Sequence, residues 1–332
     1  MFVQAAQRLG YRTVVLDPEP ASPAGQVAER HIVADYLDAE GLAQLAACAD
    51  AITTEFENVP AAALLRLAAT RRVAPGAESV AICQDRIAEK AQFVRCGVPC
   101  APHASISSAA ELDAVDAALL PGILKTARLG YDGKGQIRVR TRAELAAAWR
   151  ELRGVPCVLE QLLPLAAELS VIVARGADGA NVALPVQRNL HRNGILAVTE
   201  VPAPGVAAAA AEAAVAAVQR VAASIGHVGV LCVEFFVLQD GTLVANEMAP
   251  RPHNSGHYSI DACDLSQFDL QVRALTGAPL LAPRLHSTAV MLNLLGDLWT
   301  AGAGTPAAPD WAPVLALPGV HLHLYGKSEV RP

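Results

Sequence analysis

The sequence predicts an α/β fold in its N-terminal part, followed by an α+β region built from antiparallel hairpins. Over the first 56 residues, three short apolar runs alternate with two helical patterns, and this alternation is typical of a parallel sheet. Further on, Asn193-Gly194 and Asp240-Gly241 each separate two runs rich in β-branched residues, which indicates two hairpins. With 332 residues, the chain is long enough for two or three domains.

The elements follow from these patterns in chain order. A doubly wound sheet normally opens with a buried strand and a glycine-rich turn; we expect both to be missing, because the chain begins within a helix. The expected helices are 1–9, 38–48, 206–225 and 267–276, the last ended by Gly277. The expected strands are 12–16, 31–34, 51–56, 122–126, 136–139, 156–159, 169–174, 182–190, 194–201, 230–238, 242–249, 290–295 and 320–325.

Composition excludes several classes of protein. The net charge is −6, from 26 Lys and Arg against 32 Asp and Glu, without a long basic run, so we expect no nucleic-acid partner. Although 53% of residues are hydrophobic, every apolar run is interrupted before it could span a bilayer, and no signal peptide opens the chain. The seven cysteines include no C-x-x-C pair, which indicates reduced thiols in a cytoplasm.

The hairpin around residues 240–241 carries the strongest chemical signal. If these two residues form the turn, Gln239 pairs with Thr242, and Glu234 lies directly opposite Glu247, with Cβ atoms about 4.5–5.5 Å apart. Two carboxylates facing each other in an apolar strand are unfavourable unless something offsets their repulsion. A divalent cation bound together with substrate phosphates fits best, whereas a shared proton or a solvated face are the alternatives.

Two further polar segments are candidates for contact with an anionic substrate. Glu55 and Glu57 follow an apolar strand, and α/β sheets bind ligands at the carboxyl ends of their strands; a polar loop before Pro60 explains them equally well. Arg86 and Lys90 share one helix face at i,i+4. Two like charges there indicate an anionic partner, although a solvated face is the simpler interpretation.

A glycine-rich segment, 130–136, joins two expected strands, and Lys125 lies on the first of them. Glycines let backbone amides approach phosphates, and lysines add positive charge. The segment does not match the Walker loop, and an ordinary hairpin is the alternative. A later strand leads into Glu160–Leu163, whose backbone could bind an adenine ring. The 250–258 segment is rich in Arg, His, Asn and Ser, which favours an anion-binding loop over a plain turn.

Taken together, these stretches resemble the ATP-grasp superfamily and, within it, the N5-carboxyaminoimidazole ribonucleotide synthetases. The resemblance covers essentially the whole chain and rests on four motifs: 55–60 (EFENVP), 84–90 (QDRIAEK), 130–136 (GYDGKGQ) and 246–257 (NEMAPRPHNSGH). It implies an ATP-grasp fold with an N-terminal domain at 1–80, an ATP-grasp domain at 81–275 and an incomplete, β-rich C-terminal domain at 276–332. The resemblance also implies that the family's first strand precedes Met1 and that its C-terminal motif continues beyond Pro332.

The resemblance further implies a role for each matching residue. The nucleotide-binding residues would be Arg86, Lys125, Gly130, Tyr131, Asp132, Gly133, Lys134, Gly135, Gln136, Glu160, Gln161, Leu162, Leu163, Glu168, His191, Asn246 and Glu247. Glu234 and Glu247 would be the Mg²⁺ ligands. Residues for the acceptor and bicarbonate would be Glu55, Glu57, Arg251, His253, Asn254, Ser255, Lys327 and Arg331, with Arg251, His253 and Lys125 taking part in catalysis.

By this resemblance the chain is an ATP-dependent carbon–nitrogen ligase of purine biosynthesis and a homodimer. It would use ATP and bicarbonate to carboxylate 5-aminoimidazole ribonucleotide. Two alternatives remain. A formate-dependent glycinamide ribonucleotide transformylase shares the metal pair, although the 251–257 loop argues against it. A non-catalytic nucleotide-binding protein is the other, because both ends of the family's sequence pattern are missing.

Overall fold

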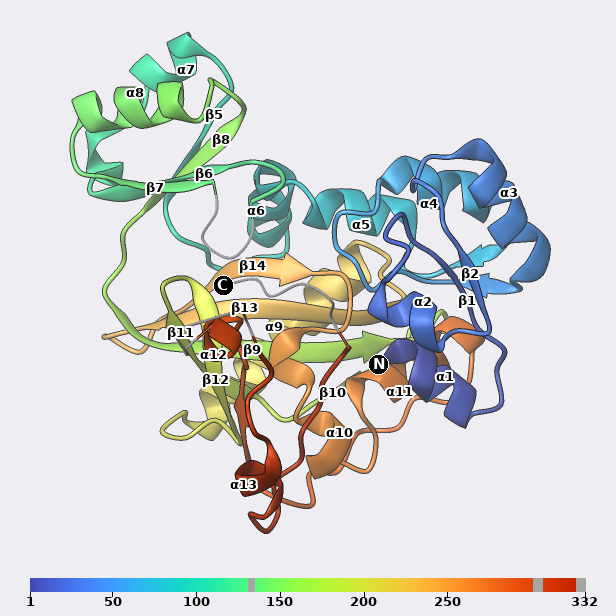
Figure 1. Ribbon diagram of the computed structural model, residues 1–332. Coiled ribbons are helices and arrows are strands. Elements are labelled where there is room, and N and C mark those ends of the chain that lie inside the picture. Colours follow the sequence, from blue (N-terminus) through green and yellow to red (C-terminus); the bar gives the residue numbers. More distant parts are fainter. Residues whose placement is uncertain (131–134, 301–306, 327–332) are drawn as a thin grey trace. The chain divides into compact units, whose positions relative to one another are not determined.

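The structure is a computed structural model that describes residues 1–130, 135–300 and 307–326. The chain divides into two compact units, and each is considered by itself. The first unit comprises Met1–Asp50 and Leu292–Pro332, and the second comprises Ala51–Met291. Figure 1 labels the elements of both units.

The first unit contains two parallel strands with short helices. Val14 of β1 pairs with Arg30 of β2 in parallel register, as the alternation of strands and helices predicts. Asp38 begins α3 by accepting a hydrogen bond from the Gly41 amide at 2.6 Å, because an N-cap carboxylate satisfies an amide that the helix leaves unpaired. The elements are α1 (Phe2–Arg8), β1 (Val14–Leu16), α2 (Pro23–Val27), β2 (Arg30–Ile32), α3 (Ala39–Cys48), α12 (Asp297–Thr300) and α13 (Ala312–Leu315).

The second unit opens with a second parallel pair and three helices. Ile52 of β3 pairs with Val73 of β4. Strand β3 is shorter than the predicted 51–56 because the Thr54 hydroxyl bonds to both the amide and the carbonyl of Phe56, and such local bonds compete with a strand ladder. The elements are β3 (Ala51–Ile52), α4 (Ala61–Ala68), β4 (Arg72–Val73), α5 (Ala77–Cys83) and α6 (Arg86–Arg95).

A four-stranded antiparallel sheet follows, with the order β5-β8-β6-β7. Leu124 and Leu159 from its strands pack with Leu145 and Ala148 of α8 in one buried cluster, so this helix covers one face of the sheet (Figure 1). The elements are β5 (His103–Ile106), α7 (Ala109–Asp113), η1 (Ala117–Leu119), β6 (Gly122–Thr126), β7 (Gln136–Val139), α8 (Arg142–Glu151) and β8 (Cys157–Gln161).

The largest sheet has the order β14-β13-β9-β11-β12-β15, with β10 paired to β9. Residues of β13 alternate between two cores: Leu231 packs with Val218 of α9, whereas Val230 packs with Leu270 of α11. The sheet is therefore covered on both faces. The elements are β9 (Leu165–Arg175), β10 (Asn181–Ala183), β11 (Gln187–Arg192), β12 (Ile195–Val201), α9 (Ala208–Ser224), β13 (Gly229–Leu238), β14 (Leu243–Ala249), η2 (Asn254–Gly256), α10 (Ser259–Ala262), α11 (Gln267–Thr276) and β15 (Ala289–Leu292).

One predicted strand is absent and another is divided: the strand expected at 182–190 forms two, β10 and β11, which both pair with β9. Residues 320–325 form no strand in the structure, although their apolar pattern predicts one. Three of the apolar side chains of this stretch, Val320, Leu324 and Tyr325, are exposed, so the pattern does not correspond to a buried face. By contrast, the predicted strand at 290–295 is present as β15 and pairs with the large sheet.

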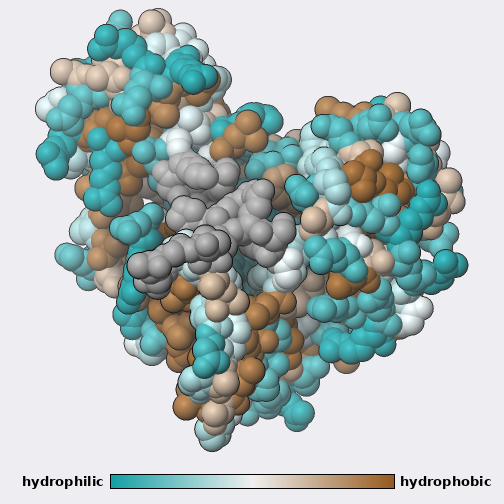
Figure 2. Space-filling model, in the orientation of Figure 1, coloured by the Kyte–Doolittle hydropathy of each residue, from teal (hydrophilic) through white to brown (hydrophobic). Residues whose placement is uncertain are grey.

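The hydrophobic residues of the chain are divided between its surface and its cores. On the face shown in Figure 2, hydrophilic residues are interspersed with smaller hydrophobic patches. Among the residues that the structure describes, no helix is both long enough and apolar enough to cross a membrane. Two of the apolar cores lie on the two faces of the large sheet.

Candidate active site

Strands β13 and β14 bring the two predicted metal-binding carboxylates together. Glu234 pairs with Glu247, so the predicted juxtaposition is confirmed. The predicted turn is wrong, because Gln239 does not pair with Thr242. Instead the Leu238 amide donates to the Thr242 carbonyl at 2.8 Å, which leaves a three-residue turn at 239–241.

A bulge in β14 restores the predicted register. Phe235 pairs with Ala245 while Glu234 pairs with Glu247, so Asn246 is the extra residue of the bulge. A bulge changes the direction of the side chains next to it. Here the consecutive residues Asn246 and Glu247 both contact charged groups. The Asn246 amide oxygen lies 3.3 Å from Lys125 Nζ, and Glu247 forms an ion pair with a helix arginine, considered below. The sequence therefore predicts the pairing correctly only because two one-residue offsets cancel.

Two buried lysines and one buried glutamate form the centre of the site. Glu160 at the end of β8 lies 3.2 Å from Lys125 Nζ on β6 and 3.3 Å from Lys90 Nζ on α6, and Lys90 also donates to the Asn246 carbonyl at 2.8 Å. Burial lowers the pKa of Lys125. Burial alone would raise the pKa of Glu160, but the two lysines outweigh it and lower that pKa. The cluster thus has a net positive charge, which suits phosphate.

Helix α6 fixes the strand that carries Glu247. Its N-cap is Asp85, whose side chain accepts from two amides of the first turn. One turn presents Arg86, which binds the Glu247 carboxylate at 2.7 Å, and Glu89, which accepts the Met248 amide hydrogen. Burial raises the pKa of Glu89 to about 8. Because β14 is an edge strand, the contact from Glu89 satisfies a backbone amide that would otherwise lack a partner.

The two facing carboxylates have opposite pKa shifts. Burial raises the pKa of Glu234, and the charge of Glu247 raises it further. Burial also disfavours ionised Glu247, but Arg86 outweighs this and lowers its pKa. Like charges side by side are unfavourable without a compensating cation, and Glu234, rather than the Arg86-bound Glu247, is the carboxylate whose pKa is raised.

The loop after β14 lies against the same carboxylates. Arg251 binds Glu57 at 2.7 Å, and His253 Nε2 lies 3.5 Å from Glu234. The Ser255 hydroxyl is 2.9 Å from His253 Nδ1, and the His253 backbone bonds to Gln267. Burial lowers the pKa of His253 to about 3, so the imidazole is neutral at pH 7 and the loop presents Arg251 as its positive charge.

Glu168 and His191 lie together on neighbouring strands. The His191 imidazole contacts the Glu168 carboxylate between β9 and β11. Burial lowers the pKa of His191, but its bond to Glu168 and the nearby Glu234 outweigh burial and raise it. The structure thus brings this predicted pair close to the carboxylates of the hairpin.

The glycine-rich segment is described only at its two ends. The Gly130 carbonyl lies 3.4 Å from the Arg86 guanidinium. Gly135 has a φ of +70°, and a Cβ there would lie 2.6 Å from the Thr126 hydroxyl, so glycine is required. Gln136 pairs with Lys125 across β6 and β7. The predicted phosphate contacts Tyr131, Asp132, Gly133 and Lys134 lie outside the described residues.

The remaining predicted residues are less closely associated with the charged cluster. Gln161 turns its amide to the Ala118 carbonyl at 3.0 Å, and Leu162 is 43% exposed. Leu163 follows it on the same segment and is half-buried, as is Asn254 in η2. Glu55 is exposed, so the structure favours Glu57 over Glu55. The predicted substrate-binding residues Lys327 and Arg331 lie outside the described residues.

The sequence did not predict three contacts of the site. These are the contacts of Glu89 with Met248, of Lys90 with Glu160 and of Gln267 with His253. The i,i+4 spacing of Arg86 and Lys90 indicates a shared face, but not what that face binds. Glu89 and Gln267 offered no signal, because their partners are distant in sequence.

The residues present fit a hard divalent cation. Two carboxylates and an amide oxygen are ligands that Mg²⁺ accepts, and it is usually completed by water and substrate phosphates. The repulsion between Glu234 and Glu247, which raises the pKa of Glu234, is the feature that such a cation would offset. Among the described residues, no group of three or more His, Cys, Asp and Glu side chains is arranged to hold a metal ion.

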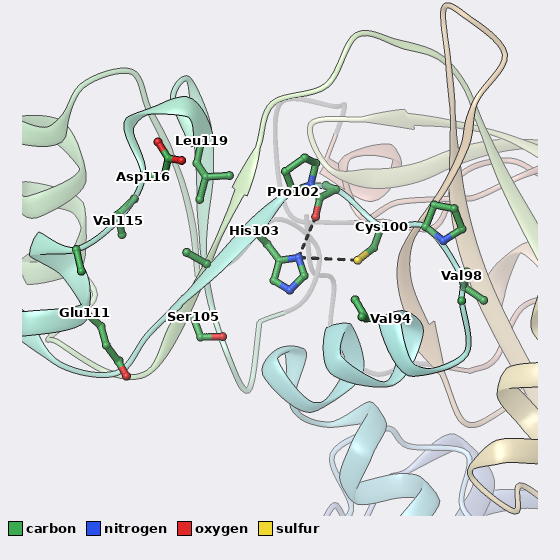
Figure 3. A pocket seen from close by; sticks show the side chains of 15 residues that line it. Val94, Val98, Cys100, Pro102, His103, Ser105, Glu111, Val115, Asp116 and Leu119 are labelled. Carbon is green, nitrogen blue, oxygen red and sulfur yellow. Dashed lines mark hydrogen bonds between the residues drawn. The ribbon is translucent and has the colours of Figure 1, made fainter.

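A separate pocket of about 870 Å³ lies between the end of α6 and the β5–α7 region (Figure 3). Val94, Val98 and Leu119 line it, together with the His103 imidazole, which lies 2.9 Å from the Ala101 carbonyl and 3.8 Å from Cys100 Sγ. This pocket is formed by residues 94–119, whereas the charged cluster is formed mainly by β6, β8, β13 and β14.

Family models match three consecutive parts of the chain. A ribonucleotide synthetase preATP-grasp domain matches residues 1–84, an ATP-grasp domain matches 91–268, and a phosphoribosylaminoimidazole carboxylase C-terminal domain matches 289–332. Fold and site together define the class of protein as an ATP-grasp ligase.

Comparison with individual proteins narrows the class. The N5-carboxyaminoimidazole ribonucleotide synthase of Brucella melitensis is 44% identical over 100% of this chain and 90% of its own length. That of Pseudomonas aeruginosa is 42% identical over 99% and 87%. The chain belongs to the N5-carboxyaminoimidazole ribonucleotide synthase family.

Solved structures agree with this assignment. An ADP complex of N5-carboxyaminoimidazole ribonucleotide synthetase superposes with a TM-score of 0.91 at 37% identity, covering 99% of this chain and 85% of the other. The enzyme from Aspergillus clavatus in complex with ADP and 5-aminoimidazole ribonucleotide superposes with a TM-score of 0.89 at 30% identity, covering 100% and 87%. The predicted ATP-grasp fold is confirmed.

Proposed function

We propose that the chain carboxylates 5-aminoimidazole ribonucleotide with ATP and bicarbonate, giving N5-carboxyaminoimidazole ribonucleotide in purine biosynthesis. The observation that carries this proposal is the position of the Arg251–His257 loop, which places His253 Nε2 3.5 Å from Glu234. An acceptor bound by this loop would lie beside the carboxylates that face the nucleotide phosphates. The relatives' names agree with this reaction.

The charged cluster supports the nucleotide half of the reaction. Lys125 and Lys90 are held by Glu160 and, with Arg86, provide positive charge where phosphate oxygens would lie. Glu234 and Glu247 would hold Mg²⁺, which when bound would offset the negative charge that develops during phosphoryl transfer. Glu168 and His191, which contact each other, are both electrostatic neighbours of Glu234.

Bicarbonate is a weak electrophile and must be activated. In the proposed sequence a bicarbonate oxygen bonds to the γ-phosphorus of ATP as ADP leaves, giving carboxyphosphate. The acceptor's exocyclic amine then bonds to the carboxyl carbon, phosphate leaves and the nitrogen loses a proton. Arg251, fixed by Glu57 at 2.7 Å, supplies positive charge for the anionic reactants, whereas neutral His253, bonded to Ser255, orients the acceptor.

We also propose a homodimer located in the cytoplasm. The family resemblance supports the dimer. The seven cysteines, all of which are free thiols, are in keeping with a reducing compartment. Light scattering of the purified protein would give twice the 34.6 kDa chain mass if the dimer forms.

The function is tested by following phosphate release and product with ATP and one of two substrate pairs, either 5-aminoimidazole ribonucleotide with bicarbonate or glycinamide ribonucleotide with formate. We expect phosphate release with bicarbonate and not with formate. The label of ¹³C-bicarbonate should appear in the carboxylated product. Release that depends on formate and glycinamide ribonucleotide would instead identify a transformylase. ATP binding without turnover in any combination would identify a non-catalytic protein.

A further inference from the structure

Gln267 is a buried residue that holds the backbone of His253. It is the first residue of α11 and has no exposed surface. Its side-chain oxygen accepts the His253 amide hydrogen at 2.8 Å, and its nitrogen donates to the His253 carbonyl at 2.7 Å. One side-chain amide therefore satisfies both backbone groups of a single residue, which restricts rotation on either side of that residue.

The same glutamine also lies under the far end of the loop. Its side-chain nitrogen is 3.4 Å from His257 Nδ1. Its own amide donates to the Ser259 hydroxyl at 3.0 Å, and that hydroxyl donates to the Gly256 carbonyl. A Cβ on Gly256 would lie 2.5 Å from Gln267 Oε1. The loop can approach α11 this closely only because position 256 is glycine.

The position of Gln267 is fixed independently of the loop. Ser266 and Asp269 form a capping box at the start of α11, in which each side chain satisfies the other residue's amide. Leu270, one turn along, packs in the core with Ile172 and Val230 of the large sheet. The glutamine side chain thus projects from a rigid element.

We propose that Gln267 is a positioning residue for the acceptor. It fixes the His253 peptide so that the imidazole, bonded to Ser255 and 3.5 Å from Glu234, faces the carboxylate pair. The inference rests on the proposed function in assigning the Arg251–His257 loop to the acceptor. Gln267 acts through His253 and contributes no group of its own to the reaction.

Gln271 offers a matched control one turn further along α11. It is also a glutamine with no exposed surface. Its side-chain oxygen accepts the Val230 amide hydrogen at 2.6 Å, and its nitrogen donates to the Thr53 hydroxyl at 2.7 Å. Loss of these bonds weakens the packing of the helix on β13 but leaves the bonds of the 253–257 segment in place.

The test compares Gln267→Met with Gln271→Met, because methionine keeps the length of the side chain and removes both hydrogen bonds. Thermal unfolding checks that both variants fold. Peptide-level hydrogen exchange over residues 251–258 reports on the loop, and steady-state kinetics gives KM for 5-aminoimidazole ribonucleotide and for ATP. A third variant, Gln267→Glu, keeps an oxygen as acceptor for the His253 amide and replaces the donor nitrogen by a second carboxyl oxygen, and it replaces Gln267→Met if that variant does not fold.

We expect Gln267→Met to raise both the hydrogen-exchange rate of the loop and the KM for the acceptor by about tenfold. This is the order of effect expected when two buried hydrogen bonds are lost. The KM for ATP should change by less than about twofold, and Gln267→Glu should lie between Gln267→Met and the parent chain. Gln271→Met should lower the unfolding temperature without either effect on the loop.

This design distinguishes failure of the positioning role from failure of the proposed function. Equal changes in loop exchange and acceptor KM for the Gln267 and Gln271 variants would overturn the positioning role. If the parent chain does not carboxylate 5-aminoimidazole ribonucleotide, the proposed function fails, and the exchange data alone then decide whether Gln267 holds the loop.

Discussion

The two sides of the site are held by different kinds of interaction. On the proposed nucleotide side, ion pairs dominate, with Arg86 on Glu247 at 2.7 Å and Lys125 on Glu160 at 3.2 Å. On the proposed acceptor side, neutral hydrogen bonds hold His253 of the histidine loop and burial keeps its imidazole uncharged, and an ion pair joins Arg251 of the loop to Glu57. Charged groups that neutralise one another can exchange partners when phosphates and a cation arrive, whereas neutral bonds keep their geometry whatever the charge of the ligand.

The largest expected effect is on the charged side. Glu247→Gln keeps the side chain's volume but removes one of the two proposed metal carboxylates, so bicarbonate-dependent phosphate release should fall about a thousandfold, or several kcal/mol. Circular dichroism should show an intact fold. Glu200→Gln, in the same sheet but paired with Arg188 at 3.9 Å, is the control and should retain activity. Near-normal turnover by the Glu247 variant would refute the metal assignment.

Glu160→Gln tests how much the buried ion pairs with Lys90 and Lys125 contribute to the free energy of unfolding. The variant leaves Lys90 and Lys125 buried without their shared counter-charge; their side chains are 1% and 7% exposed. Removing one partner from a buried ion pair costs about 3–5 kcal/mol of unfolding free energy, which denaturant titration would measure. Glu29→Gln breaks the exposed pair with Arg12 and should leave stability unchanged. Equal losses in the two variants would show that burial does not set the energetics of these pairs.

A neutral buried histidine away from the site predicts how the stability of the protein depends on pH. His227 is fully buried between the Ser79 hydroxyl and the Val230 carbonyl, and burial lowers its pKa to about 4. As pH falls from the unfolded-state pKa of about 6.5 towards 4, the unfolded chain binds a proton that the folded chain does not, so stability falls, by about 3 kcal/mol at most.

Urea titrations between pH 7 and 4 would measure this effect. His227→Gln should have a shallower pH dependence over this interval than the parent chain. An identical slope in both proteins would mean that other groups account for the acid sensitivity.

The sequence predicts local structure best where the signal is local. Helix α11 ends at Gly277 with a left-handed φ of +76°, and a glycine at that position is a direct signal. Strands β6 and β7 have the expected bounds. The strand expected at 320–325 is absent because apolar alternation alone does not provide a partner strand or a buried face.

The site could be predicted only in part for a related reason. The facing of Glu234 and Glu247 follows from one hairpin, but the bulge at Asn246 has no strong sequence signal. Glu89 bonds to a residue 159 positions away, and Gln267 to one 14 positions away across a loop. Such contacts depend on how helices pack on the large sheet, which periodicity does not specify.

The division between the two sides is tested most directly by comparing Arg251→Ala with Arg86→Ala. Calorimetry gives the affinity for MgADP, and steady-state kinetics gives KM for 5-aminoimidazole ribonucleotide. Losing a charge-assisted bond costs about tenfold or more. We expect Arg251→Ala to raise the acceptor KM by that factor with MgADP affinity within about twofold of the parent, and Arg86→Ala to show the reverse. Equal losses of both affinities in both variants would contradict the account.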